Sequence, residues 1–241
     1  MKKRLFDVAL SLATLVVAFP VISIVALLVF LEDRKSPLYI AKRVGLEGTG
    51  FKMIKLRSMT INSTLINSTS KNDPRITRIG HLIRRFKIDE LSQFINVLNG
   101  SMSIVGPRPN VSDEVKLYTE VERRMLSVRP GITDLASIIF SDESDILAES
   151  SDPNLDYNRL IRPWKSRLAL FSISQSSLQF DTWIIMLTAL NSFSRTLTLR
   201  LISAYLRNTS SEPALADVAL RVSSLTPYPP PGSDLIVDKA Y

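Results

Sequence analysis

The chain begins with a long apolar run. From Leu5 to Leu31 there are 27 residues with a single formal charge, Asp7, and basic residues stand both before and after the run. An apolar stretch of this length predicts a membrane segment. A cleaved signal peptide is the alternative, but the run is long for the apolar region of a signal peptide, and no small-x-small cleavage site follows it.

Pro20 interrupts this segment near its middle. Proline cannot donate the helical hydrogen bond to residue 16 and clashes with that carbonyl, so the two arms can bend apart. A straight helix of roughly 40 Å would cross a hydrocarbon layer of about 30 Å, whereas neither arm alone would cross it. Because Lys and Arg flank both ends, the positive-inside rule favours the cytoplasmic side for both. A re-entrant helix-break-helix satisfies this rule, and a kinked spanning helix is the alternative.

The following residues predict a small α+β domain that is mostly helical. Two short strand-like segments, 36–41 and 51–57, enclose a glycine-rich turn and predict a hairpin. The Asn/Ser/Thr-rich residues 60–72 predict a loop. Helical spacing then predicts one helix near residues 79–86 and another from about Asp89 to Leu98, ended by Asn99-Gly100. The apolar positions of the first helix are Ile79, Leu82, Ile83 and Phe86, and those that the second should bury are Leu91, Phe94, Ile95 and Leu98.

Two further segments complete the pattern. Residues Trp183–Leu206 are apolar but carry Arg195 and Arg200, which favours a helix lying in the membrane interface over a second span. An ordinary helix facing the core is the alternative. From Asn208 onward the chain, with Pro227, Pro229, Pro230 and Pro231, is predicted to be a flexible tail.

Composition and charge narrow the chemistry. With no cysteine and one histidine, His81, the sequence excludes disulfides, thiol catalysis and His-rich metal clusters. Residues 34–130 contain 18 basic and 8 acidic side chains, so this block should attract phosphate groups, nucleic acid or an anionic membrane surface. Aromatic residues are not interleaved with the basic ones, as a stacking platform needs, so we do not expect nucleic acid as a partner.

Two short motifs carry candidate chemistry. Asp89 and Glu90 stand at the predicted start of a helix, where adjacent carboxylates can share a divalent cation or attack phosphorus. Ordinary helix-start composition is the alternative. Arg108 lies between Pro107 and Pro109, so a stiff backbone presents its guanidinium for binding a phosphate; a structural turn is the alternative.

Together with other positions, these motifs resemble the bacterial sugar transferases, the monotopic polyprenol-phosphate phosphoglycosyl transferases. The resemblance is ordered along residues 34–133 and weaker over 1–35 and 134–200. The matching residues are Arg43-x-Gly45-x-x-Gly48, Phe51, Lys55-x-Arg57-Ser58-Met59, Asp73-Pro74-Arg75-Ile76-Thr77-Arg78-x-Gly80, Asp89-Glu90-Leu91, Asn96-Val97-x-x-Gly100-x-Met102-Ser103-x-Val105-Gly106-Pro107-Arg108-Pro109 and Arg129-Pro130-Gly131-Ile132-Thr133.

The resemblance implies an enzyme of the undecaprenyl-phosphate hexose-1-phosphate transferase type. Such an enzyme transfers a sugar 1-phosphate from a nucleoside diphosphate sugar, usually a UDP-sugar, to undecaprenyl phosphate and releases UMP. It requires magnesium (Mg2+) and begins the synthesis of a surface glycan such as exopolysaccharide, capsule or O-antigen. In this reaction Asp89 would attack the sugar-linked phosphorus to give a phosphosugar-aspartyl intermediate, and Glu90 would help to hold the metal.

The family pattern also implies the remaining site residues and the location. Lys55, Arg84 and Arg108 occupy the family's basic positions and are candidates for binding the substrate, with Arg57 a further candidate. Pro20 matches the proline at which the family's membrane helix re-enters. The expected location is the bacterial inner (cytoplasmic) membrane, in contact with its lipids, with the catalytic domain on the cytoplasmic face.

The implied organisation is a re-entrant membrane helix over residues 1–35, a catalytic domain with interfacial helices over 36–207 and a flexible Pro-rich tail over 208–241. A homodimer is compatible with this sequence. Asp134 departs from the family, which commonly has glycine after Ile132-Thr133. This departure keeps open an alternative, a catalytically silent membrane scaffold of a glycan assembly complex.

Overall fold

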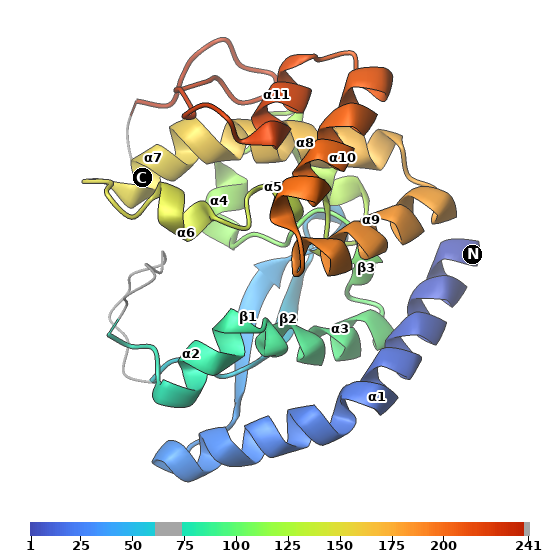
Figure 1. The fold of residues 1–241 in the computed structure, drawn as a ribbon, viewed down its shortest axis with the longest axis vertical. Coiled ribbons are helices and arrows are strands. Elements are labelled where there is room, and N and C mark those ends of the chain that lie inside the picture. The colour runs from blue at the N-terminus through green and yellow to red at the C-terminus, as the bar shows by residue number, and fades with distance from the viewer. Residues whose placement is uncertain (61–73, 239–241) are drawn as a thin grey trace.

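The structure, a computed structural model, describes residues 1–60 and 74–238. It is a mostly helical α+β fold with two small sheets (Figure 1). The predicted loop over residues 60–72 lies, apart from Thr60, outside the described residues. The strands are β1 (Leu38–Val44), β2 (Gly50–Leu56), β3 (Ser103–Val105) and β4 (Gly131–Thr133). The helices are α1 (Lys2–Asp33), η1 (Leu46–Gly48), α2 (Arg78–Arg85), η2 (Ile88–Gln93), α3 (Phe94–Leu98), α4 (Ser112–Lys116), η3 (Glu122–Ser127), α5 (Leu135–Ile139), α6 (Glu143–Ile146), α7 (Pro153–Asp156), η4 (Tyr157–Ile161), α8 (Arg162–Ser174), α9 (Leu178–Asn191), α10 (Arg195–Thr209) and α11 (Ala214–Leu220).

The two sheets stand between two helical regions. β1 and β2 form the predicted antiparallel hairpin, in register from Leu38 opposite Leu56 to Val44 opposite Gly50. β3 and β4 pair in parallel. Figure 1 shows α1 along one side of the molecule and α8, α10 and α11 on the opposite side, with the hairpin between them. The main core lies among β3, β4, α5 and α8–α11, where Leu135, Ile139, Leu168 and Ile184 are fully buried.

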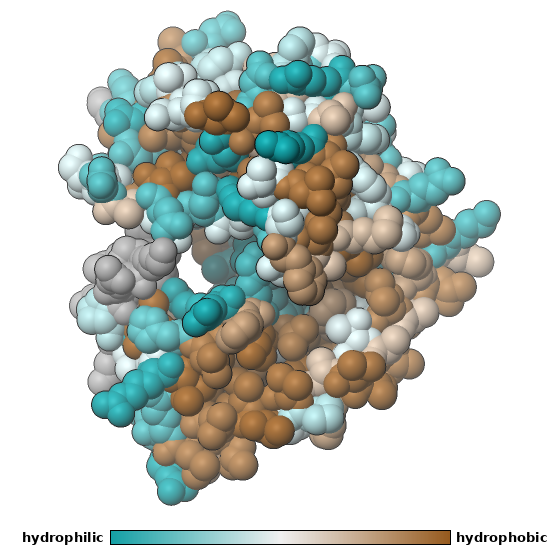
Figure 2. All heavy atoms as spheres, in the orientation of Figure 1, coloured by the Kyte–Doolittle hydropathy of each residue, from teal (hydrophilic) through white to brown (hydrophobic). Residues whose placement is uncertain are grey.

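The N-terminal helix α1 is long and apolar enough to cross a membrane, and it buries few of its own side chains. Figure 1 shows it changing direction partway along its length, and its internal proline is Pro20, a residue that bends helices. Val17 is 80% exposed and Phe19 68% exposed. Figure 2 shows apolar side chains covering the region that α1 forms. An apolar surface of this extent requires an apolar partner, as lipid would provide.

Both ends of α1 are attached to the same domain. Near its start, the lone charge of the apolar run is buried, because the Asp7 carboxylate accepts hydrogen bonds from Ser103 Oγ at 2.8 Å and from the Ile104 backbone N–H at 3.3 Å. Near its end, Asp33 forms a two-point ion pair with Arg57, with both N···O distances 2.6 Å. In between, the second arm packs Val25 and Val29 against β2 and α2.

The C-terminal part of the described chain consists of helices and a docked segment. The apolar stretch Trp183–Leu206 forms two helices, α9 and α10, and α10 buries Leu199, Ile202 and Leu206 in the core. After α10 ends at Thr209, the region predicted to be a flexible tail contains α11 and a segment that packs on α8. In this segment the Tyr228 ring stacks on Trp164 with the ring centroids 4.4 Å apart.

Candidate active site

A tight turn presents the paired carboxylates. Thr77 caps α2 by accepting a hydrogen bond from the Gly80 N–H at 2.9 Å. The helix ends at Arg85, and two residues later Lys87 has a φ of 52°, in the left-handed region that non-glycine residues seldom adopt. Because the chain reverses there, η2 follows at once, with Asp89 and Glu90 in its first turn. The predicted α-helix from Asp89 to Leu98 is therefore a 3₁₀ segment, η2, followed by the short α3.

The buried side chains of η2 and α3 are Ser92, Gln93, Asn96 and Val97, three of them polar. Of the residues predicted to be buried, Ile95 is 42% exposed, so its predicted burial is wrong, and Leu91, Phe94 and Leu98 are only partly buried. The reason is the free edge of β2, whose backbone groups need partners. Asn96 Oδ1 accepts from the Ile54 N–H at 2.8 Å, and its Nδ2 donates to the Lys52 carbonyl at 2.7 Å. Ser92 Oγ donates to the Ile54 carbonyl at 3.1 Å.

This edge pairing brings the catalytic candidates together. Lys55 Nζ lies 3.4 Å from Asp89 Oδ2, and Arg108 Nη2 lies 2.9 Å from Glu90 Oε1. The side chains of Lys55, Asp89 and Glu90 are 16–20% exposed and that of Arg108 is 42% exposed. Each carboxylate is therefore paired with a cation from a distant segment, and both stay within reach of a substrate.

The loop that carries Arg108 is held by two glycines. Gly106 donates to the Thr133 carbonyl at 3.1 Å, and Gly131 donates to the Pro107 carbonyl at 2.9 Å. A Cβ on Gly106 would meet the Arg129 carbonyl at 2.5 Å, and one on Gly131 would meet the Gly106 nitrogen at 2.1 Å, so these backbones approach each other too closely for a side chain. On the far side of Arg108, the Val44 N–H donates to the Asn110 carbonyl at 3.0 Å. The guanidinium therefore projects from a loop that is anchored at both ends.

The site's charges influence one another. Burial lowers the pKa of Lys55, helped by the nearby Arg108 charge and opposed by Asp89 and Glu90. Burial pushes the pKa of Glu90 upward, but the charges of Arg108, Lys55 and Lys87 outweigh it, so this pKa lies below its usual value. Glu90 in turn raises the pKa of Arg108. Glu90 and Arg108 therefore stay charged at neutral pH, while Lys55 loses its proton more readily than an exposed lysine does.

The other two predicted substrate-binding residues, Arg57 and Arg84, contact neighbouring parts of the domain. The Arg57 side chain is 4% exposed, and all its guanidinium nitrogens are engaged, by Asp33 and by backbone carbonyls that include that of Ser36 at 2.7 Å. In this arrangement Arg57 holds the end of α1 against the domain. Arg84 donates to Ser58 Oγ at 3.0 Å and contacts the Met59 sulfur at 3.0 Å, so these contacts place it beside the residues that follow β2.

The carboxylates of Asp89 and Glu90 could hold a magnesium ion together with a phosphate substrate. Across residues 1–60 and 74–238, no three His, Cys, Asp or Glu side chains lie close enough to hold a metal together. Magnesium is usually bound by one or two carboxylates plus phosphate oxygens and water, so the adjacent Asp89 and Glu90 suit an ion that arrives with a phosphate substrate.

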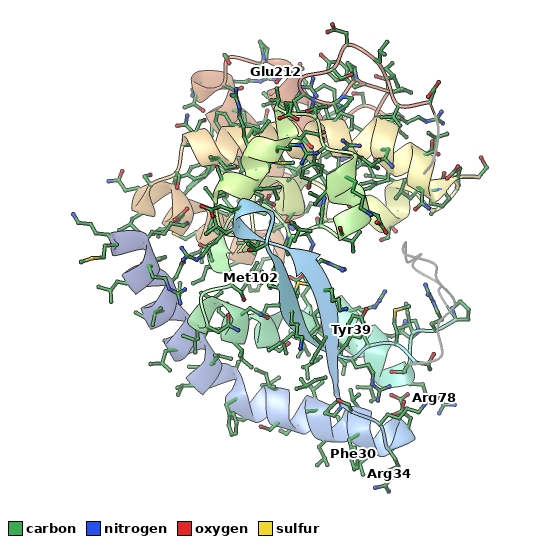
Figure 3. All side chains as sticks on the ribbon, turned by 180° about the vertical axis from the view of Figure 1, so that it is seen from behind. Phe30, Arg34, Tyr39, Arg78, Met102 and Glu212 are labelled. Carbon is green, nitrogen blue, oxygen red and sulfur yellow. The ribbon has the colours of Figure 1, made fainter. Side chains whose placement is uncertain are left out.

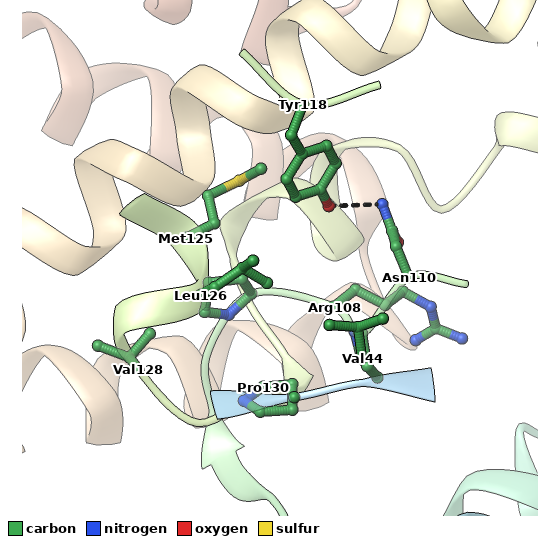
Figure 4. A pocket seen from close by; sticks show the side chains of 11 residues that line it. Val44, Arg108, Asn110, Tyr118, Met125, Leu126, Val128 and Pro130 are labelled. Carbon is green, nitrogen blue, oxygen red and sulfur yellow. Dashed lines mark hydrogen bonds between the residues drawn. The ribbon is translucent and has the colours of Figure 1, made fainter. Parts of the chain in front are cut away.

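Further polar side chains surround Arg108, and no sequence motif marks them as site residues. Figure 4 shows Arg108 beside Asn110 and Tyr118, with the Asn110 amide donating to the Tyr118 hydroxyl at 2.9 Å. A second cavity, of about 50 Å³, is lined by Arg108, Asp134 and Lys165, among others. Asp134 was noticed only as a departure from the family; a carboxylate within the apolar segment 131–140 was the signal that could have marked it.

Comparison with known proteins identifies the family. The sequence model of the bacterial sugar transferase family matches residues 1–195. Two exopolysaccharide production proteins named ExoY, from Sinorhizobium fredii and Rhizobium meliloti, are 37% and 36% identical to the chain, which covers 68% and 69% of their lengths. The chain therefore belongs to the bacterial sugar transferase family.

The names of other relatives indicate the family's chemistry. A UDP-glucose:undecaprenyl-phosphate glucose-1-phosphate transferase of Escherichia coli is 36% identical over 79% of this chain and 40% of its own length. The chain thus spans about two fifths of that relative. A protein of Bacillus subtilis named as a putative undecaprenyl-phosphate N-acetylgalactosaminyl 1-phosphate transferase is 46% identical over 49% of this chain and 65% of its own length.

Proposed function

We propose that this protein is a phosphoglycosyl transferase that moves a sugar 1-phosphate from a UDP-sugar to undecaprenyl phosphate and releases UMP, as an early membrane step in exopolysaccharide or related surface glycan synthesis. The observation that carries this proposal is the pairing of Asp89 with Lys55 and of Glu90 with Arg108, in an element that also packs against the apolar helix α1. Two carboxylates and two cations suit phosphoryl transfer, and their closeness to α1 suits an acceptor dissolved in lipid.

The first step uses Asp89 as the nucleophile. Its carboxylate oxygen attacks the sugar-linked phosphorus, the bond from that phosphorus to the UMP oxygen breaks, and UMP leaves with the bonding electrons. Lys55 and Arg108 compensate the negative charge of the diphosphate during this step. Magnesium held by Asp89 and Glu90 would neutralise charge on the departing phosphate oxygens.

The second step regenerates the enzyme. A phosphate oxygen of undecaprenyl phosphate attacks the phosphorus of the phosphosugar-aspartyl intermediate, and the Asp89 carboxylate is released as the acyl-phosphate bond breaks. The product is the sugar-bearing undecaprenyl diphosphate. Since the lipid chain stays in the membrane, its phosphate must meet Asp89 near the headgroups.

The two attachments of α1 support a re-entrant anchor. Asp7, near one end, bonds to β3, and Asp33, at the other end, pairs with Arg57 of the same domain. A helix whose two ends both touch one polar domain can dip into one leaflet, whereas a straight span would carry one end across the bilayer. This arrangement favours a domain on the cytoplasmic face of the inner membrane, where UDP-sugars are made.

Turnover and trapping test the proposed function together. Full-length protein in lipid nanodiscs, given undecaprenyl phosphate, magnesium and UDP-glucose, UDP-galactose or UDP-N-acetylgalactosamine, should release UMP with at least one donor. Asp89→Asn should lower this rate by at least about 1,000-fold, because it removes the nucleophile. Asp113→Asn is the matched control, since this carboxylate is 80% exposed and its ion pair within the described residues is with Lys116.

Without the lipid acceptor, donor labelled in its sugar-linked phosphate should leave label covalently on the wild-type chain and none on Asp89→Asn. Unchanged turnover in Asp89→Asn would exclude Asp89 as the nucleophile. Absence of turnover with every donor, from a correctly inserted protein, would favour the silent scaffold instead.

A further inference from the structure

The cavity beside the proposed active site has an unusual polar lining. Arg108, which pairs with Glu90, also lines this cavity of about 50 Å³, together with Asn110, Tyr118, Asp134 and Lys165. At about 15 Å³ for each water-sized group, the cavity has room for about three such groups. It therefore suits hydroxyl or hydroxymethyl groups at the edge of a ligand better than a whole planar base.

Asp134 is the most deeply buried charged group in this lining. It is 1% exposed, and its Oδ1 accepts a hydrogen bond from the Ser137 N–H at 2.7 Å, which caps α5. Capping alone does not require a charge, since Asn and Ser cap helices about as well as Asp does. A buried carboxylate is costly to desolvate, so its presence among Arg108 and Lys165 calls for a further use.

The position of the donor in the proposed reaction indicates what reaches this cavity. The phosphorus that Asp89 attacks is bonded directly to the sugar oxygen, whereas the nucleoside is one phosphate further away. A diphosphate held by Lys55 and Arg108 therefore places the sugar ring next to the Arg108 loop. Carboxylates only accept hydrogen bonds, which matches the O–H groups of a sugar.

We propose that Asp134 is a specificity-determining residue whose carboxylate accepts a hydrogen bond from a hydroxyl group of the donor sugar. This assignment rests on the proposed function, and it adds the residue by which this chain distinguishes one UDP-sugar from another. The residue type at position 134 then sets the choice of donor, while the phosphate and nucleotide contacts stay the same.

Binding measurements test this independently of turnover. In Asp89→Asn protein, which cannot form the covalent intermediate, the Kd values of UDP-glucose, UDP-galactose, UDP-N-acetylgalactosamine and UDP are measured by calorimetry at fixed magnesium concentration. The preferred UDP-sugar should bind more tightly than UDP. Adding Asp134→Asn should raise the Kd of that UDP-sugar by about 10- to 100-fold and leave the Kd of UDP unchanged, because only a contact with the sugar is lost.

Matched controls separate specificity from folding. Asp152→Asn changes another capping aspartate, which lies outside the cavity and accepts a hydrogen bond from the Leu155 N–H at 3.1 Å. This variant should alter neither the Kd of the preferred UDP-sugar nor that of UDP. If Asp134→Asn unfolds the protein, Asp134→Ser keeps a capping oxygen and serves as the second variant. Equal weakening of UDP and UDP-sugar would assign the cavity to the nucleotide, and no weakening of either would assign Asp134 to capping alone; both results overturn the proposal. Sugar-dependent binding without UMP release from the wild type would instead reject the proposed function and keep the sugar site.

Discussion

At the scale of single residues, Arg57 and Arg108 show how the surroundings decide the use of one side-chain type. The Arg57 guanidinium is enclosed by Asp33 and backbone carbonyls, whereas Arg108 is 42% exposed and has Glu90 as its ion-pair partner. An enclosed guanidinium stabilises the fold, while a partly exposed one next to a carboxylate can exchange that partner for a phosphate.

Alanine at these two positions should therefore have opposite effects. We expect Arg108→Ala to raise the donor KM by about 10- to 100-fold with little change in Tm, because a charge-assisted phosphate contact is lost. Arg57→Ala should lower Tm by roughly 5 °C or more and leave the donor KM of the folded protein unchanged, since it leaves Asp33 unpaired. Thermal unfolding and steady-state kinetics on both variants check this. A raised donor KM with an unchanged Tm in Arg57→Ala would show that Arg57 binds the substrate.

The lowered pKa of Lys55 predicts an alkaline limit to activity. The protonated amine is the form that compensates phosphate charge, so kcat/KM should fall with rising pH at a lower pH than the ordinary lysine value of 10.5. The effect of Lys55 on the free energy of unfolding has the opposite sign. At pH values between its pKa in the folded chain and its higher pKa in the unfolded chain, the unfolded chain binds more protons, so the contribution of Lys55 to stability increases as pH rises. Lys55→Arg should move the alkaline limb of the pH–rate profile to higher pH, because guanidinium keeps its proton. If the alkaline limb stays at the same pH in Lys55→Arg, a group other than Lys55 causes it.

Local patterns identified part of the site. Asp89, Glu90 and Arg108 stand in recognisable motifs, and the structure places them together. Strand alternation places residues 55 and 57 on the same face, so it could not predict that Lys55 contacts Asp89 while Arg57 contacts Asp33. The two side chains diverge because β2 ends at Leu56, and the regular alternation ends with it. The pairing of Lys55 with Asp89 joins residues 34 positions apart and depends on tertiary packing.

At the scale of elements, periodicity predicted the hairpin and α2, yet it assigned the wrong buried face to η2 and α3. The usual rule places apolar residues inside because water is the solvent on the other side. Here the free edge of β2 binds Ser92 and Asn96, which are buried, while Ile95 is exposed. A sequence pattern gives the period of a helix, but the groups that need partners decide which face is buried.

The glycine contact between β3 and β4 gives a prediction at this scale. Gly106→Ala should destabilise the protein by about 1–3 kcal/mol, because its Cβ would press on the Arg129 carbonyl and displace the Arg108 loop. Turnover of the remaining folded protein should fall as well. Gly50→Ala is the control, since a Cβ at Gly50 meets no atom within 4 Å and should change neither quantity appreciably. Chemical denaturation and UMP release measure the two effects, and equal behaviour of the variants would show that the loop tolerates displacement.

At the scale of the whole molecule, the position of the site depends on how α1 lies in the membrane. Figure 3 shows Phe30 and Arg34 near the end of α1, close to the region of Arg78 and on the side of the molecule away from Glu212. The residue pattern predicted an interruption at Pro20 and left spanning and re-entry open, because hydropathy carries no information on contacts between the helix ends and the domain; the family resemblance implied re-entry. Those contacts, through Asp7 and Asp33, favour re-entry.

The absence of cysteine allows a direct test of topology. Single cysteines at Lys2 and Lys35, both exposed, and at Lys116 on the catalytic domain can each be labelled with a membrane-impermeant maleimide in intact spheroplasts and in inverted vesicles. A re-entrant helix predicts that all three are labelled in inverted vesicles and protected in spheroplasts. A cysteine at Phe19, beside the bend and 68% exposed to the surroundings of the helix, should be protected in both because lipid covers it.

The proline and the buried aspartate should together maintain this arrangement. Pro20→Leu lets the backbone hydrogen bond to Val16 form and favours a straight helix, and Asp7→Leu removes the contact with β3. In the double variant we expect the cysteine at position 2 to become labelled in spheroplasts while those at 35 and 116 stay protected, with UMP release reduced because the first arm no longer packs under α3. Labelling of residue 2 in spheroplasts without these substitutions would establish a spanning helix and remove the geometric basis for re-entry.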